Sequence, residues 1–198
     1  MEWDRLFEDL EDQLASDAEG ARAALDAESE RLRIVRLTLR DRLSAFAAAR
    51  VPASATLVDG TVLRGRIRET GADWTALDAA DGRSLDLVPA AAVAAWSVEH
   101  PALLSSTAAS AGLSPLRARM TLGYVLRHLA RRRVGVTVRM RSGALLSGTI
   151  DRAGADHLDL ALHDPGAPRR AQEVRGFRIV PFAAVVCIGA SAATAPFG

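Results

Sequence analysis

The sequence predicts an α+β protein: a long N-terminal helix plus two similar small five-stranded β barrels, each preceded by a helix. The first observation is an internal repeat, because residues 36–74 align without a gap with residues 119–157, at an offset of 83. The second is an apolar heptad pattern near the N-terminus, and the third is a series of short apolar segments separated by glycine-containing turns. A repeat of this kind indicates two copies of one structural unit. The expected domains are an acidic amphipathic helix 1–50, barrel 51–98, linker 99–115, helix 116–132, barrel 134–190 and a mobile tail 191–198.

Residues 3–48 are predicted to form one long helix, or two helices that meet near Gly20. From Leu14 to Phe46, apolar residues recur at alternating steps of four and three, interrupted at Glu28 and Arg42. Such a repeat over several heptads is typical of a coiled coil. The open alternative is a helix that folds back on the barrels of its own chain. In a homo-oligomer, the residues expected to form the seam are Leu14, Leu25, Leu32, Val35 and Leu39.

Residues 51–98 have the pattern of a small β barrel. Asp59-Gly60 is a strong hairpin signal between two apolar segments. Gly65 lies within the second predicted strand, where glycine allows the sharp bend that a small closed barrel needs. Residues 134–190 repeat this pattern, with a longer connection before the fourth strand.

The segment between the barrels contains a predicted linker and a predicted helix. Residues 99–115 are rich in Ser, Ala and Pro, which is typical of a linker. Ser114-Pro115 then predicts the start of the helix 116–132, because Pro is favoured at the first helical position.

Charge is distributed unevenly along the chain. The net charge is +1, every basic residue is Arg, and the chain contains no Lys and no Asn. Residues 1–30 contain eleven Asp and Glu against two Arg, a net of −9, so the remainder carries +10. This division suggests either an intramolecular contact between the two parts or an acidic appendage beside a basic body.

The helix 116–132 has the strongest claim to a binding function. Six Arg and no acidic residue occur between positions 114 and 133. Arg binds phosphate through a planar fork of donors, and aromatic rings can stack on bases. The alternatives are a solvated basic face and a docking site for the chain's own acidic helix. The candidate nucleic-acid-binding residues are Arg117, Tyr124, Arg127, His128, Arg131, Arg132, Arg139 and Arg141.

Catalytic and metal-binding patterns are weak, so neither an enzyme nor a cofactor is expected. Asp73 and Asp156 each follow Gly-Ala, where Asp usually caps its own turn. His157, Asp159 and His163 fit no common metal-ligand spacing, and only one copy of the repeat has them. There is no glycine-rich phosphate loop and no Gly-x-Ser-x-Gly motif.

A disulfide framework is excluded, because Cys187 is the only cysteine. It lies in an apolar segment and is expected to be buried. No apolar run approaches the length of a membrane span, and the N-terminus lacks the basic and apolar regions of a signal peptide. A soluble cytoplasmic protein is therefore expected.

The glycine frame of the second and third predicted strands resembles the Sm-like fold. In the first copy the frame consists of Gly60, Leu63, Gly65, Ile67, Gly71, Asp73, Trp74 and Leu77. In the second copy it consists of Gly143, Leu146, Gly148, Ile150, Gly154, Asp156, His157 and Leu160, with His157 at a position that is usually apolar. The resemblance implies RNA binding, either in rings of subunits or by single domains. The Asn of the family's nucleotide pocket has no counterpart here, so the resemblance does not extend to that pocket.

Three functions follow from these observations. The first is a non-enzymatic module that binds RNA, or less favourably DNA, through the Arg-rich helix and the second barrel. The second is a protein-interaction scaffold that dimerises or recruits partners through the acidic helix. The third is a DNA-binding regulator, which is less favoured because no helix-turn-helix pair is evident.

Overall fold

A computed structural model describes residues 2–80, 82–108, 115–165, 170 and 172–191. The chain divides into two compact units, residues 1–38 and residues 39–198. Within the described residues, no helix is both long and apolar enough to cross a membrane.

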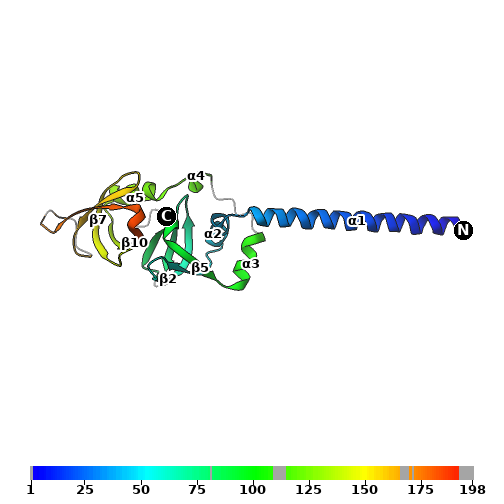
Figure 1. Cartoon of the computed structure of the whole chain (residues 1–198), viewed down its shortest axis with the longest axis horizontal. Coiled ribbons are helices and arrows are strands. Elements are labelled where there is room, and N and C mark those ends of the chain that lie inside the picture. The colour runs from blue at the N-terminus through cyan, green and yellow to red at the C-terminus, as the bar shows by residue number, and fades with distance from the viewer. Residues whose placement is uncertain (1, 81, 109–114, 166–169, 171, 192–198) are drawn as a thin grey trace. The chain divides into compact units, whose positions relative to one another are not determined.

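The first unit is the helix α1 (Glu2–Arg36), which is unbroken in Figure 1. It continues through Gly20 and ends before Leu37 and Thr38, so of the two alternatives for Gly20 the structure shows the unbroken helix. Gly20 is tolerated because Ala, Glu and Arg, which favour helices, surround it. The predicted helix 1–50 is therefore two helices, and the second, α2 (Leu39–Ala48), belongs to the other unit.

The second unit contains two copies of one arrangement, each a helix followed by five strands. The first copy, which we call repeat 1, consists of α2, β1 (Pro52–Leu57), β2 (Val62–Thr70), β3 (Trp74–Ala79), β4 (Ser84–Pro89), the short 3₁₀ helix η1 (Ala90–Ala92) and β5 (Val93–Val98). The second copy, repeat 2, consists of α5 (Leu122–Arg131), β6 (Gly135–Met140), β7 (Leu145–Ala153), β8 (His157–Leu162), β9 (Gly176–Pro181), η2 (Phe182–Ala184) and β10 (Val185–Ser191).

The backbones of the two repeats agree in detail. Arg50 and Arg133, which follow the leading helices, both adopt left-handed conformations, with φ of 51° and 50°. Gly60 and Gly143 in the first hairpins have φ of 85° and 81°. The pairing of the second and third strands shifts register between Ile67 and Glu69 in repeat 1 and at the matching place in repeat 2. The duplication predicted from the sequence therefore describes the backbone well.

The ten strands form one antiparallel sheet, in the order β5-β1-β2-β3-β4-β10-β6-β7-β8-β9. The sheet is not closed, so the two separate closed barrels expected from the sequence are not what the strand pairing shows. The repeats join where β10 pairs with β4, with Ile188 opposite Leu87 and Ala190 opposite Leu85. Each half keeps the same strand order. The free edge of β4 forms its backbone hydrogen bonds with β10 of the other repeat.

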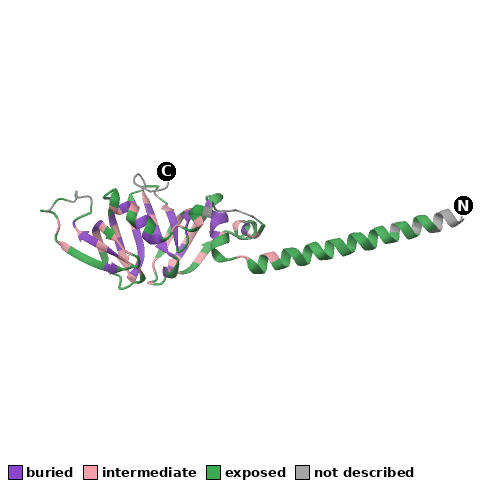
Figure 2. Ribbon diagram, turned by 90° about the horizontal axis from the view of Figure 1, so that it is seen from above, coloured by how far each residue is buried: buried purple, intermediate pink, exposed green. Residues whose placement is uncertain are grey.

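The main hydrophobic core crosses this junction. Leu85 and Leu87 of repeat 1 pack in one cluster with Leu126, Leu129 and Ile188 of repeat 2. Figure 2 shows the buried residues concentrated in the sheet and in the helices that pack on it. The two repeats are therefore joined by apolar burial as well as by strand pairing.

The segment between the repeats differs from the prediction. Residues 99–115, expected as a linker, contain α3 (His100–Ala108), which packs on α2; Arg42 donates hydrogen bonds to the Ser106 hydroxyl and the Leu103 carbonyl. Residues 109–114, which include the predicted cap Ser114, and residues 192–198 of the predicted tail lie outside the described residues, while Ser191 ends β10.

The predicted helix 116–132 is interrupted by contacts from repeat 1. It consists of α4 (Pro115–Ala118) and α5, separated at Arg119–Thr121. The Met120 carbonyl accepts hydrogen bonds from Trp74 Nε1 and Ala72 N, both at 2.9 Å. These bonds to residues almost 50 positions away hold Met120 outside a helical conformation.

Candidate nucleic-acid interface

Helix α5 presents an apolar face to the sheet and a basic face outward. Leu122, Val125, Leu126 and Leu129 are buried against β7 and the main core. At 3.6 residues per turn, the opposite side of the helix carries Tyr124, Arg127, His128 and Arg131 within about one third of the circumference. Tyr124 is 49% exposed, so its ring is available to a ligand. The structure brings these four predicted site residues together.

A surface hollow of about 490 Å³ lies between α5 and β7, and four guanidinium groups line it. They belong to Arg127, Arg131, Arg133 and Arg152. One carboxylate, that of Asp151, also lines the hollow. Arg127 is held in place by a hydrogen bond from Nη1 to the Gly154 carbonyl at 3.2 Å. We call these four arginines the Arg cluster.

Sequence reasoning missed two members of the Arg cluster. Arg133 belongs to the basic segment but is not among the predicted site residues, and Arg152 lies in a strand outside that segment. The repeat contains a usable signal for Arg152, because its counterpart in repeat 1 is Glu69. A charge reversal at equivalent positions indicates that the two surfaces have diverged.

Two of the predicted site residues are engaged in other contacts. Arg117 forms an ion pair with Glu69 at 2.9 Å, and Glu69 is a buried carboxylate that needs a partner. Arg141 donates from Nε to the Ala183 carbonyl and from Nη2 to the Ala91 carbonyl, and so links η2 to η1. A carboxylate from a distant strand therefore neutralises one of the six arginines of the basic segment.

The remaining two predicted residues lie on other surfaces. Arg132 caps the C-terminus of α5 and lines a separate hollow with Arg133 and His163. Arg139 lies in β6 near Asp59 of repeat 1. Burial raises the pKa of Asp59, but hydrogen bonds from Thr61 and the charge of Arg139 lower it, and the net shift is downward.

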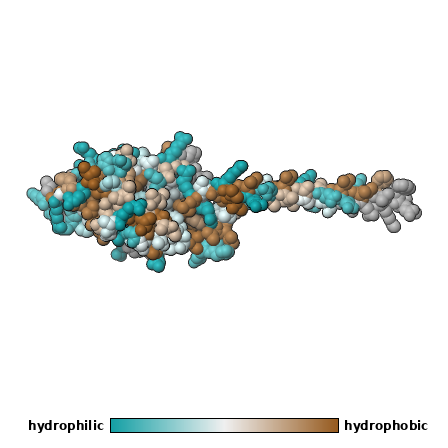
Figure 3. Space-filling model, in the orientation of Figure 1, coloured by the Kyte–Doolittle hydropathy of each residue, from teal (hydrophilic) through white to brown (hydrophobic). Residues whose placement is uncertain are grey.

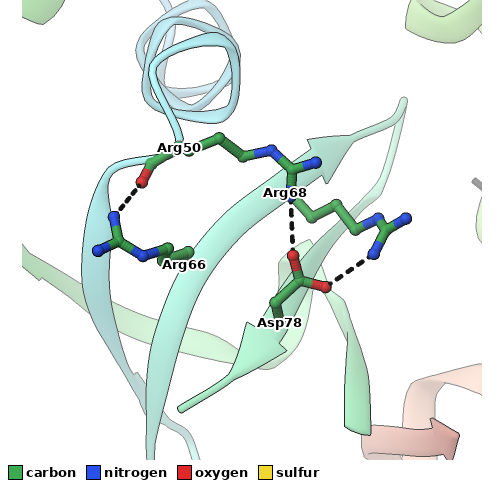
Figure 4. Close-up of polar contacts among 4 residues, drawn as sticks. All are labelled: Arg50, Arg66, Arg68 and Asp78. Atoms are coloured by element: carbon green, nitrogen blue, oxygen red, sulfur yellow. Dashed lines mark hydrogen bonds and ion pairs between the residues drawn. The ribbon is translucent and has the colours of Figure 1, made fainter. Parts of the chain in front are cut away.

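The equivalent surface of repeat 1 is neutralised by a carboxylate. Asp78 pairs with Arg50 at 2.8 Å and with Arg68 at 3.1 Å (Figure 4). Arg66 donates to the Arg50 carbonyl at 2.9 Å in the same view. In repeat 2 the position of Asp78 is occupied by Ala161, and Arg133 corresponds to Arg50. Asp151 occupies the position of Arg68, so the carboxylate at the Arg cluster comes from β7 and not from the third strand of the repeat.

The predicted oligomerisation residues are exposed within their own helices. Leu14, Leu25, Leu32 and Val35 of α1 are 68%, 69%, 48% and 77% exposed, and Leu39 at the start of α2 is 59% exposed. Figure 3 shows hydrophobic side chains interspersed with hydrophilic ones along α1. Arg33 donates two hydrogen bonds to Glu30 at 2.7 Å, and these lower the pKa of the Glu30 carboxyl.

The candidate metal residues are not gathered around one point. His157 Nδ1 lies 2.8 Å from Asp156 Oδ1, and His163 Nε2 lies 2.8 Å from the Thr149 hydroxyl. Among the residues that the structure describes, no three His, Cys, Asp or Glu form a group able to hold a metal ion. Burial raises the pKa of the Cys187 thiol well above its usual value, and nearby Asp86 raises it further.

The two candidate turn aspartates differ from the expectation and from each other. Asp73 Oδ1 accepts a hydrogen bond from Leu122 N at 2.7 Å, so it caps the distant helix α5 and not its own turn. The Asp156 side chain is 90% exposed and pairs with His157, whose hydrogen bond lowers the Asp156 pKa. Neither arrangement resembles a pair of catalytic carboxylates.

Comparisons with known proteins add no family assignment. The chain matches no protein-family model and no curated protein.

Proposed function

We propose that this protein is a non-enzymatic binding module that holds the phosphate backbone of RNA on the Arg cluster. The observation that carries this proposal is the hollow between α5 and β7, which four arginines and one aspartate line. Arg suits this role because its fixed fork of donors matches the oxygens of a phosphate.

The outer face of α5 supplies the second part of the proposed interface. Tyr124 and His128 lie one turn apart, beside Arg127 and Arg131. Their rings offer planar faces for unstacked bases, which are what proteins usually recognise in single-stranded RNA. We therefore propose a short single-stranded segment as the ligand, with phosphates on the Arg cluster and a base against Tyr124.

We further propose that each repeat is a small Sm-like barrel unit. The support comes from the shared order of a helix and five strands, the register shift in the long second strand, and the matching geometry of the hairpin glycines. Gly65 and Gly148 add to it, because a Cβ at either position would lie 2.0 Å from a carbonyl oxygen of the neighbouring strand.

The test of RNA binding is an anisotropy titration of labelled single-stranded RNA at two salt concentrations. Affinity should fall steeply with salt, because each neutralised phosphate releases counterions. Arg131→Gln together with Arg152→Gln should weaken binding and flatten the salt slope by about 0.7 for each phosphate that is no longer neutralised. Tyr124→Ala should weaken binding without changing the salt slope, because a stacking interaction releases no ions.

The matched control is Arg64→Gln with Arg66→Gln, which removes the same charge from exposed positions on β2. Equal loss of affinity in both double variants would show attraction by net charge alone and would reject the Arg cluster as the site. Absence of RNA binding at low salt would reject the proposal, and tighter binding to duplex DNA would favour the DNA-binding regulator.

A protein-interaction scaffold is the second candidate function, and the exposed stripe of α1 favours it. Four large apolar side chains, each about half exposed or more, follow the heptad spacing of a coiled-coil seam. Leu25→Asp with Leu32→Asp should lower the mass measured by light scattering, because a buried unpaired carboxylate costs several kcal/mol, of the order of 3–5. An unchanged mass would remove the support for this candidate.

A further inference from the structure

Helix α1 carries a narrow apolar stripe along its length. The stripe contains six large apolar side chains, each at least 48% exposed: Phe7, Leu10, Leu14, Leu25, Leu32 and Val35. At 3.6 residues per turn, these six lie within about a quarter of the helix circumference. Ala18 and Ala21 continue the stripe between its two halves. A stripe this narrow is typical of the seam between two paired helices.

Charge divides the same helix into two unlike halves. Residues 2–19 contain eight Asp and Glu against one Arg, a net of −7. Residues 20–36 contain four Arg against three Asp and Glu, a net of +1. Two parallel copies would lie acidic half against acidic half, at about the 8–10 Å between packed helices, where physiological salt screens charge only in part. Two antiparallel copies place the acidic half of each beside the Arg-containing half of the other.

We propose that α1 of one copy pairs with α1 of a second copy, antiparallel and about a two-fold axis. This inference rests on the scaffold role, the second candidate function above, and specifies its partner and its orientation. A second copy suits the stripe because one helix supplies both the acidic and the basic half that antiparallel pairing needs. The contact is isologous, so it closes at two copies.

One register suits both the stripe and the charges. It places these residues opposite each other in the two copies: Leu14 and Leu32, Ala18 and Glu28, and Ala21 and Leu25. Glu28, the acidic residue within the seam, then faces a small side chain and no second carboxylate. Sliding one helix by a heptad would place Glu28 opposite Glu11 in one direction and opposite Leu25 in the other.

The residues that flank the seam set the orientation of a helix pair. In the antiparallel register, Asp17 lies beside Arg31 of the second copy, and Glu8 lies beside Arg36 of the second copy. Both attractive contacts occur twice, while Arg22 meets its own copy once at the two-fold axis. In a parallel pair, Asp17 would lie beside Arg22, but Arg31 would lie beside Arg36. Antiparallel pairing therefore has the larger excess of attractive over repulsive contacts.

The orientation also decides where the two chains leave the helix pair. Arg36 of each copy lies opposite Leu10 of the other, so the two Arg36 residues are about 40 Å apart along the axis at 1.5 Å per residue. The chains therefore continue into residues 37–38 at opposite ends of the pair. A parallel pair would bring both chains out at the same end.

Cross-linking of single-cysteine variants tests the orientation. In a Cys187→Ala background, Leu14→Cys and Leu32→Cys are made as separate full-length chains. Neither alone should form a disulfide-linked dimer, because antiparallel pairing keeps the two copies of either residue about 27 Å apart along the axis. Mixed and allowed to exchange, they should form a reducible dimer, because the two thiols face each other across the seam. Ser16→Cys mixed with Glu30→Cys is the matched control, since these positions lie at the same height on the outer face and should not cross-link.

The outcomes separate this inference from the scaffold role itself. A dimer linked by Leu14→Cys alone would show parallel pairing, which overturns the antiparallel proposal and leaves the scaffold role standing. A wild type that stays monomeric by light scattering across a concentration series would overturn both. A dimeric protein whose Leu14→Cys and Leu32→Cys mixture does not cross-link would contradict the proposed register.

Reversal of one charge has opposite effects in the two orientations. In the antiparallel pair, Arg31→Asp places a carboxylate beside Asp17, so dissociation should shift to a several-fold higher concentration. In a parallel pair the new carboxylate would face Arg36 and tighten the association, and that result would overturn the proposal. Adding Asp17→Arg should restore most of the affinity, because the opposite charges are re-formed with their positions exchanged. Ala23→Glu with Ala27→Glu, which changes the net charge equally on the outer face, should leave the dissociation nearly unchanged.

Discussion

Repeat 1 and repeat 2 have nearly the same backbone and very different surfaces. In repeat 1, Asp78 neutralises Arg50 and Arg68, and α3 packs over the leading helix α2. In repeat 2, Ala161 replaces Asp78, Arg152 replaces Glu69, and the outer face of α5 carries exposed Arg and Tyr side chains. The comparison teaches that the two repeats keep the same residue where the backbone needs a special conformation, as at Gly60 and Gly143. At exposed positions, where the backbone sets no such requirement, their charges differ.

The repeats also differ in how their fourth strands are used. Strand β4 is covered by β10, and its equivalent β9 is an edge. The same strand of the repeat is therefore buried in the core as β4 and lies at the edge of the sheet as β9. This difference gives internal controls that separate the role of a residue from the role of its surroundings.

The largest expected difference is between Leu87→Ala and Ile179→Ala. Leu87 is fully buried at the junction, so its truncation leaves a cavity and should lower the free energy of unfolding by about 3 kcal/mol. Ile179 is 74% exposed, so its truncation in dilute single chains should cost about 0.5 kcal/mol or less. Urea unfolding of both variants measures the difference, and equal losses would show that the burial difference between β4 and β9 is wrong.

The next prediction concerns the equivalence of the two backbones. Gly65→Ala and Gly148→Ala each place a Cβ at 2.0 Å from a carbonyl oxygen, that of Asp78 or Ala161. Each should lower the free energy of unfolding by a similar amount, about 2–3 kcal/mol, because the neighbouring strand must move. Gly20→Ala in α1 is the control, since nothing lies near its added Cβ. A tolerated substitution in one repeat alone would show that the strands approach differently.

The smallest expected difference is between Asp73→Ala and Asp156→Ala. Asp73 caps α5 through Leu122 N, so its loss should cost about 1 kcal/mol of stability. Asp156 is an exposed residue whose side chain pairs with the adjacent His157, and its replacement should have little effect. Thermal unfolding followed by circular dichroism compares the two, and a larger loss for Asp156→Ala would reverse the assigned roles.

Much of the fold could be predicted from local patterns. The Asp59-Gly60 turn, the second strand that contains Gly65 and the apolar face of α5 depend on residues close together in sequence, and each lies where the local pattern predicts it. The gap at Arg119–Thr121 could not be predicted, because Asp73 and Trp74 cause it from almost 50 residues away.

Four members of the candidate site, Tyr124, Arg127, His128 and Arg131, could be grouped by helical spacing alone. Arg152 could not, because it reaches the Arg cluster from β7 only when α5 packs on that strand.

The sequence by itself determined the duplication, the order of helices and strands within each copy, and the long helix before them, because periodicity and turn residues act over a few positions. Only the tertiary structure decided that the copies share one sheet, since the pairing of Leu87 with Ile188 joins residues about one hundred positions apart. It also decided which arginines are neutralised: Arg117 meets Glu69, and Arg50 meets Asp78, only after distant strands come together. The sequence gives the charge of each residue, but the electrostatic field at the surface depends on which carboxylates the fold brings next to each arginine.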